Sequence, residues 1–353
     1  MPVIASIGTA VPPYIIRQAE SRTFARNLFA DAFSDIDRLL TVFDSAQVEQ
    51  RHFCIPLDWF ATTSSWEEKN RLYIEHAVSL SRQAAETCLQ RAGLSPTDVD
   101  MILFISSTGI ATPSIDALLC NSLGLREDIV RLPIWGLGCA GGAAGLARSF
   151  DLAQAHPNRK VLMIALELCG LTFVHGDRSK SNLIATSLFA DGAAAALLYG
   201  DRAAESLDCH GPQLIASRST TWPNSLDVMG WDVQNDGLKV IFSRDIPTLV
   251  EQKIGDLCDS FLSAHDLSRA AVSRYIAHPG GMKVLSAYER ALDLPADALQ
   301  HAREILRTHG NMSSCTVLFV LERELAESHQ LGEHGLLFAL GPGFSAEQVL
   351  LRW

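Results

Sequence analysis

The chain has 353 residues, of which 48% are hydrophobic and 20% are charged, a composition typical of a globular protein with a large core. Its formal net charge of -11 argues against a nucleic acid as partner, because binding a duplex requires a strong positive field. The 8 cysteines form no Cys-x-x-Cys pair and no Cys/His ligand spacing, which argues against a zinc site and a secreted disulfide framework.

The first eight residues, from Met1 to Gly8, carry no basic leader and form an apolar run too short for a signal peptide or a membrane span. We therefore expect a cytoplasmic protein without membrane insertion.

The first half of the chain alternates apolar strand patterns with helical patterns. We expect a strand over 2–8, a turn at 10–13, mainly helix over 18–43 and a mixed region to residue 56. A capping box at Ser65–Glu68 predicts a long amphipathic helix to about Arg91. A strand over 101–106 follows, then a helix with Thr112 as cap and Pro113 in its first position, and buried strands over 160–166 and 188–198.

The second half repeats this order after an irregular connection that begins at Gly200. We expect a helix from about Asp245 through Leu262, a strand over 272–277, a helix from about Met282, an apolar helix ending at Leu325, and strands over 335–340 and 348–353. The repetition predicts a duplicated α/β fold, which we divide into residues 1–205 and 206–353.

Cys139 lies where a short apolar strand meets a helix of small residues, after a glycine-lined turn. The unpaired N–H groups and partial positive charge of a helix start stabilise a thiolate, so Cys139 is a candidate nucleophile. A single cysteine beside small residues is more often a packing residue, and the assignment needs partners elsewhere in the chain.

Two such partners occur in the second half. His278 ends an apolar strand before Pro279-Gly280-Gly281, and Asn311 opens a helix after Gly310, in the place that Cys139 has in the first half. Either residue alone would pass as structural. Together, the three residue types suit acyl transfer, in which a thiol carries the acyl group while His and Asn stabilise an oxyanion or enolate.

Five ordered segments carry a resemblance to a known family. The segments are 138–142, 187–195, 278–281, 310–314 and 341–344, and they resemble the motifs of type III polyketide synthases, the chalcone and stilbene synthase-like enzymes. The resemblance implies a thiolase-like fold of two duplicated αβαβα halves, layered around a buried helix pair. It also implies a homodimer that needs no cofactor and uses coenzyme A thioesters as substrates.

By this resemblance Cys139 loads an acyl group from an acyl-CoA starter, and His278 and Asn311 assist the decarboxylation of malonyl-CoA. The family also leads us to expect an ion pair between His278 and Cys139. Phe189 matches the gatekeeper between the CoA tunnel and the cavity, and Arg51 matches a residue that binds CoA phosphates at the tunnel mouth, with Lys283 and Arg307 as weaker candidates. The cavity-lining positions of the family correspond to Ser107, Thr108, Cys169, Thr172, Val240 and Ser313.

The product depends on cavity shape, which the motifs do not determine. Val240 stands where plant chalcone synthases carry an aromatic residue, and the segments 229–233 and 243–247 resemble bacterial members of the family. Many of these accept long fatty acyl starters and release alkylpyrones or alkylresorcinols, so we expect such a starter and product here.

Three alternatives remain open. A ketoacyl synthase of type III uses the same three residue types but extends once with a carrier-bound substrate. A papain-like cysteine hydrolase would hydrolyse the acyl-enzyme without decarboxylation. A scaffold subunit that keeps the fold without catalysis is the third.

Overall fold

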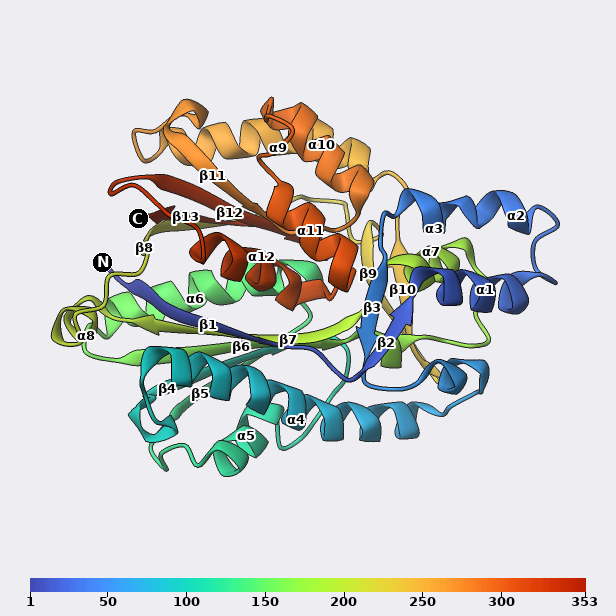
Figure 1. The fold of residues 1–353 in the computed structure, drawn as a ribbon, viewed down its shortest axis with the longest axis horizontal. Coiled ribbons are helices and arrows are strands. Elements are labelled where there is room, and N and C mark those ends of the chain that lie inside the picture. The colour runs from blue at the N-terminus through green and yellow to red at the C-terminus, as the bar shows by residue number, and fades with distance from the viewer.

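The computed structural model describes all residues 1–353, and its core is one mixed sheet of nine strands in the order β11-β12-β13-β8-β1-β7-β6-β4-β5 (Figure 1). The first half of the chain contributes β1 (Val3–Ala10), β4 (Met101–Ser106), β5 (Val130–Trp135), β6 (Lys160–Leu168) and β7 (Asp191–Tyr199). The second half contributes β8 (Gln213–Thr221), β11 (Val272–Ala277), β12 (His334–Gly341) and β13 (Ser345–Arg352).

The two parts of this sheet repeat one topology. In the first part β4 and β6 are parallel, and β7 and β1 continue antiparallel; in the second, β11 and β12 are parallel, and β13 and β8 continue antiparallel. A single pairing, Val3 with Gln213, joins the two parts. The second half has no strand that corresponds to β5. This arrangement confirms the predicted duplicated α/β fold.

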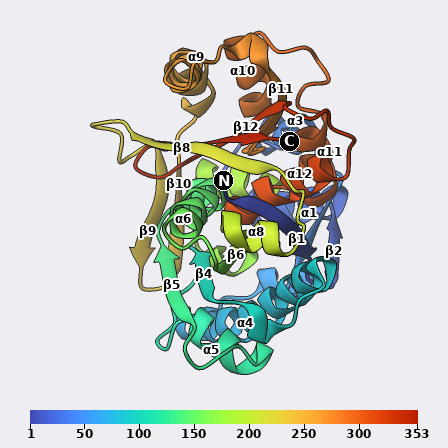
Figure 2. The same cartoon turned by 90° about the vertical axis from the view of Figure 1, so that its left-hand side faces the viewer.

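Helices form the other layers. Figures 1 and 2 show α4 (Trp66–Ala92) and α5 (Ile115–Leu123) on one outer side and α9 (Ile246–Ser263) and α10 (Met282–Leu292) on the opposite outer side. Between the two parts of the sheet lie α6 (Gly141–Ala155) and α12 (Thr316–Leu325), whose residues are mostly buried. No helix of the chain has both the length and the apolar character that a membrane crossing requires.

Small residues let the central helices approach. At Gly142, a Cβ would lie 2.1 Å from the carbonyl oxygen of Ser314, so any side chain there would push the start of α6 away from the start of α12. The glycines read from the sequence as a turn and a small-residue helix are therefore needed for contact between the halves.

Several local predictions are confirmed and others are wrong. Ser65 caps α4 by accepting a hydrogen bond from the Glu68 N–H. The helix placed at Thr112 begins at Ile115 instead, with Ser114 as its N-cap.

The expected helical stretch over 18–43 divides into α1 (Gln18–Phe29), α2 (Ile36–Leu39) and α3 (Thr41–Ser45), because turns interrupt it. Two short strands flank this region, β2 (Tyr14–Arg17) and β3 (Gln50–Phe53), and they pair with each other. The remaining helices are α7 (Lys180–Leu188), α8 (Asp201–Ser206) and α11 (Gln300–His309).

The connection predicted to be irregular after Gly200 contains β8 and a hairpin, β9 (Met229–Gln234) with β10 (Gly237–Phe242). Six short 3-10 helices complete the fold: η1 (Leu57–Ala61), η2 (Pro96–Asp98), η3 (Gly138–Ala140), η4 (Cys169–Thr172), η5 (Arg269–Ala271) and η6 (Ser313–Cys315).

Candidate active site

The duplicated fold brings the starts of its two central helices together. Cys139 lies in η3, which runs directly into α6, and Asn311 lies just before η6, which runs directly into α12. η3 and η6 lie against each other, and the side chains of Asn311 and Ser313 reach the Cys139 thiol. The predicted correspondence between Cys139 and Asn311 is thus seen in space.

Cys139 is buried, with 7% of its surface exposed. Burial raises the pKa of its thiol to about 11, although hydrogen bonding from Ser313 and Asn311 acts in the opposite direction. The charge of Glu167 raises the pKa further. In the ligand-free protein the thiol is therefore the favoured form at neutral pH.

Asn311 is held from both sides. Its backbone N–H donates to the Leu188 carbonyl (2.8 Å), and its own carbonyl accepts from the Ala190 N–H (2.9 Å), which ties it to the segment carrying Phe189. Its side-chain amide donates to the Gly280 carbonyl at 3.2 Å, while the side-chain oxygen accepts from the Ser313 N–H at 2.8 Å. The amide is fixed in place next to the thiol.

His278 follows β11, two residues before the Gly280 carbonyl that Asn311 contacts. The ring is buried and neither ring nitrogen has a hydrogen-bond partner. Burial lowers the pKa of His278 to about 3. The ion pair with Cys139 stays a prediction, and burial acts against the charged form of each of its partners.

Glu167 is a residue whose role the sequence did not suggest. It ends the buried strand β6, is fully buried, accepts from the Ser107 N–H at 2.9 Å and leaves its second carboxylate oxygen without a partner. Burial raises the pKa of this carboxyl to about 7. The signal that could have revealed it is an ionisable residue inside an otherwise apolar strand.

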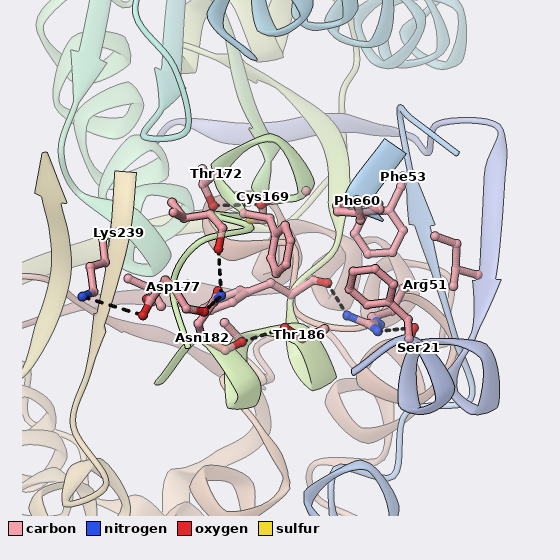
Figure 3. A pocket seen from close by; sticks show the side chains of 18 of the residues that line it. Ser21, Arg51, Phe53, Phe60, Cys169, Thr172, Asp177, Asn182, Thr186 and Lys239 are labelled. Atoms are coloured by element: carbon pink, nitrogen blue, oxygen red, sulfur yellow. Dashed lines mark hydrogen bonds and ion pairs between the residues drawn. The ribbon is translucent and has the colours of Figure 1, made fainter. Parts of the chain in front are cut away.

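Cys139 opens into a cavity of about 370 Å³, which Ser313, Phe189 and residues of the β9–β10 hairpin also line. A second, larger cavity adjoins it and is lined by Cys169 and Thr172, among other residues (Figure 3). Its walls are mainly apolar, with Phe24, Phe53, Leu57, Phe60, Phe173 and Val174 among them.

Three side chains belong to both cavities: Phe189, Trp231 and Val240. Phe189 packs edge-on against Phe242 of the hairpin, with ring centroids 6.2 Å apart. Phe189 therefore lies at the boundary of the two cavities. Its backbone forms an isolated parallel β-bridge with that of Asn311. The sequence analysis did not identify Trp231 as a cavity residue. The signal that could have revealed it is a large aromatic residue in a connection predicted to be irregular.

The other predicted cavity residues divide into two groups. Cys169, Thr172, Val240 and Ser313 line the cavities. Ser107 and Thr108 line neither: the Ser107 hydroxyl accepts from the Gly138 N–H, and the Thr108 hydroxyl accepts from the Leu168 N–H, each at 2.9 Å. Both hydroxyls are thus used by backbone groups of the first half of the chain.

The prediction that Arg51 binds CoA phosphates at a tunnel mouth is not matched by its position. Only 2% of Arg51 is exposed, and its guanidinium donates to the Phe189 carbonyl and the Ser21 hydroxyl. Of the weaker candidates, Lys283 is exposed on α10, and Arg307 forms ion pairs with Glu304 and Glu49. No cluster of three side chains in the chain could hold a metal ion.

Comparison with protein-family models matches both halves. Residues 1–202 match the N-terminal domain of chalcone and stilbene synthases, and residues 213–353 match their C-terminal domain. A putative chalcone synthase of Bacillus subtilis is 46% identical over 100% of this chain and 99% of its own. A 1,3,6,8-tetrahydroxynaphthalene synthase of Streptomyces peucetius is 36% identical over 99% of this chain and 93% of its own.

Comparison with solved structures points to the same family. The crystal structure of 1,3,6,8-tetrahydroxynaphthalene synthase from Streptomyces coelicolor, a bacterial type III polyketide synthase, superposes with a TM-score of 0.94 at 28% identity, covering 99% of each chain. This likeness confirms the thiolase-like form of the fold. With both family models, full-length relatives and the same architecture in agreement, the chain belongs to the chalcone and stilbene synthase family, the type III polyketide synthases, which are acyl-transferring condensing enzymes.

Proposed function

We propose that this enzyme condenses malonyl-CoA repeatedly, with decarboxylation, onto a long-chain fatty acyl starter and releases alkyl-α-pyrones or alkylresorcinols. The observation that carries the proposal is the apolar pocket beside the space that holds Cys139, in which 12 of the 20 lining residues are hydrophobic. Aromatic and aliphatic walls of this kind suit a flexible hydrocarbon chain.

Cys139 serves as the nucleophile in this proposal. Its sulfur attacks the thioester carbonyl of the starter, His278 accepts the thiol proton, and coenzyme A leaves as a thiol after that proton is returned. Both ring nitrogens of His278 are free of other hydrogen-bond partners, which leaves one available to accept this proton.

Malonyl-CoA is the extender. As its carboxylate leaves as carbon dioxide, hydrogen bonds from His278 and the Asn311 amide stabilise the enolate that forms on the thioester oxygen. The enolate carbon then attacks the Cys139 thioester, which forms a carbon–carbon bond and releases the Cys139 thiolate. The product remains on coenzyme A, two carbons longer, and can be loaded again.

Relatives support more than one product class. Their names include phloroglucinol synthase in Pseudomonas fluorescens (29% identical) and an α-pyrone synthesis polyketide synthase-like protein in Mycobacterium tuberculosis (26% identical). The wide apolar cavity favours the pyrone or alkylresorcinol outcome, in which an alkyl chain stays on the product.

The test is a starter series. The purified enzyme is incubated with labelled malonyl-CoA and saturated acyl-CoA starters from two to eighteen carbons, without carrier protein, and the products are identified by mass spectrometry. We expect turnover to peak with long chains and to give triketide or tetraketide products. Product from malonyl-CoA alone, or strict preference for short starters, would refute the proposed substrate. Single extension that requires carrier-bound malonate would instead support the ketoacyl synthase alternative.

We also propose a homodimer, supported by the edge strand β5. Val130, Leu132 and Trp135 are 44%, 39% and 50% exposed on it, and a neighbouring loop exposes Ile110 at 50%. An apolar edge strand with free backbone groups is suited to pair with a second copy of the chain.

A further inference from the structure

Arg51 is a buried cation whose contacts lead to the boundary between the two cavities. One guanidinium nitrogen donates to the Phe189 carbonyl at 2.8 Å, and another donates to the Ser21 hydroxyl at 2.6 Å. Figure 3 shows Arg51 and Ser21 together at one side of the larger cavity, away from Lys239 and Asp177 at the other.

No carboxylate lies within ion-pair distance of Arg51. Asp191, whose charge acts on Arg51, accepts instead from the Cys54 and Gly170 N–H groups at 2.9 and 2.7 Å. Burial lowers the pKa of Arg51 to about 9, against the influence of Asp191. Burying a guanidinium without a direct ion pair costs folding free energy. Whatever Arg51 contributes to the protein therefore comes through the hydrogen bonds that it makes.

The segment that Arg51 holds is also the segment that holds Asn311. Leu188 and Ala190, on either side of Phe189, form the two backbone hydrogen bonds to Asn311. The preceding Gly310 makes room for the arginine, because a Cβ there would lie 2.7 Å from Arg51 Cγ and 2.8 Å from the Leu188 carbonyl oxygen. Arg51 thus passes between the Phe189 segment and the Asn311 segment and contacts both.

We propose that Arg51 is a positioning residue that fixes the Phe189 ring at the boundary of the two cavities and keeps it in register with Asn311. The guanidinium supplies two directed hydrogen bonds in a fixed geometry, which a lysine ammonium on a flexible stem does not reproduce. With the ring fixed, the acyl chain in the larger cavity and the carbonyl at Cys139 keep one relative placement. Loss of that placement lets malonyl-CoA decarboxylate without condensing.

The inference rests on the proposed use of both cavities in condensation, but not on the length of the starter. It is therefore measured with whichever starter the unaltered enzyme uses best, and a failed long-chain test leaves it intact.

The experiment compares Arg51→Lys with the unaltered enzyme. It measures kcat and KM for the starter, and the carbon dioxide released from labelled malonyl-CoA per molecule of polyketide. We expect Arg51→Lys to lower kcat about tenfold with a smaller change in KM, and to raise the carbon dioxide released per product several-fold. Arg269→Lys is the control, since Arg269, like Arg51, donates to a backbone carbonyl, but it pairs with the Asp259 carboxylate and lines neither cavity.

A double-mutant cycle with Phe189→Ala separates positioning from general loss of structure. If Arg51 acts through the ring, the change in carbon dioxide per product caused by Arg51→Lys disappears in the Phe189→Ala background. The proposal would be overturned if Arg51→Lys changed the carbon dioxide released per product equally in both backgrounds. It would also be overturned if a folded Arg51→Lys protein released the same amount per product as the unaltered enzyme. Should Arg51→Lys fail to fold, Ser21→Ala removes the second partner of the guanidinium while keeping its charge, and is expected to give a smaller shift in the same direction.

Discussion

Cys139 and His278 show how one physical effect acts on two neighbouring functional residues. Burial disfavours both the thiolate and the imidazolium, so the pKa of the first rises and that of the second falls. Burial therefore acts against the ion pair expected from the family.

Replacing Cys139 by alanine removes the proposed nucleophile while keeping a small side chain at the start of a helix. We expect Cys139→Ala to lose polyketide formation by at least a thousandfold and to unfold within a few degrees of the unaltered enzyme. Product assays and thermal unfolding test this. Cys209→Ala, which lies outside both cavities, is the matched control and should retain activity. Product formation by Cys139→Ala would refute the assignment.

Glu167 predicts a pH dependence of stability. Its pKa is about 7 in the folded protein and 4.5 in the reference state, so the unfolded chain ionises first as pH rises. The stability is fully present below pH 4.5 and is lost as pH rises through 7, by on the order of 3 kcal/mol.

Glu167→Gln removes this titration. We therefore expect the free energy of unfolding of Glu167→Gln, relative to the unaltered enzyme, to increase by that amount between pH 4.5 and pH 8. Denaturant unfolding at several pH values measures it. A pH-independent difference between the two proteins would show that Glu167 is not perturbed in this way.

At the scale of elements, the β9–β10 hairpin covers both cavities and is held by contacts to the first half of the chain. Trp231 Nε1 donates to the Ser107 carbonyl at 2.8 Å, and the buried Lys69 ammonium donates to the Phe173 and Asp236 carbonyls, also at 2.8 Å. The wall of the active site is therefore second-half sequence fixed onto first-half helices and loops. This makes the hairpin the element that determines cavity width.

Val240 lies on this hairpin at the boundary of the cavities, and a larger side chain there should shorten the accepted starter. We expect Val240→Phe to shift the preferred acyl-CoA by several carbons toward shorter chains, because the added ring fills space in both cavities. Competition between short and long starters measures the shift. Val233→Phe adds the same ring at a position that is 65% exposed on the same hairpin and should leave the preference unchanged. An unshifted preference in Val240→Phe would place the acyl chain elsewhere.

At the scale of the whole molecule, the nine-stranded sheet ends in two different ways. At one end, β11 has no further strand; at the other, β5 presents an apolar edge beside the loop that contains Ile110. The asymmetry arises because the second half has no counterpart of β5. It favours association through the first half alone, with the symmetry of a two-fold dimer.

A charge on this edge should prevent association. We expect the enzyme to be a dimer in light-scattering measurements and Leu132→Lys to be a monomer at the same concentration, because a lysine on an edge strand opposes strand pairing. Leu331→Lys places the same charge at a fully exposed leucine outside the edge and should remain a dimer. A monomeric unaltered enzyme, or a dimeric Leu132→Lys, would contradict the proposed interface.

Much of the fold could be predicted because its signals are local. The capping serine at residue 65, the apolar strands and the repeated order of elements follow from residue patterns that secondary structure imposes directly. The hairpin β9–β10 and strand β8 were not predicted. Their residues are mostly half-exposed or exposed, and their sequences show no clear alternation of apolar and polar residues.

By itself, the sequence determined that Cys139, His278 and Asn311 lie at the ends of strands and starts of helices in a duplicated α/β fold, because such positions follow from local patterns and motif order. Only the tertiary structure decided that Arg51 is buried against the Phe189 carbonyl, that Ser107 and Thr108 support the backbone, and that Glu167 has a raised pKa. The reason is that burial and hydrogen-bond partners come from segments far apart in the chain, so no local pattern of residues carries them.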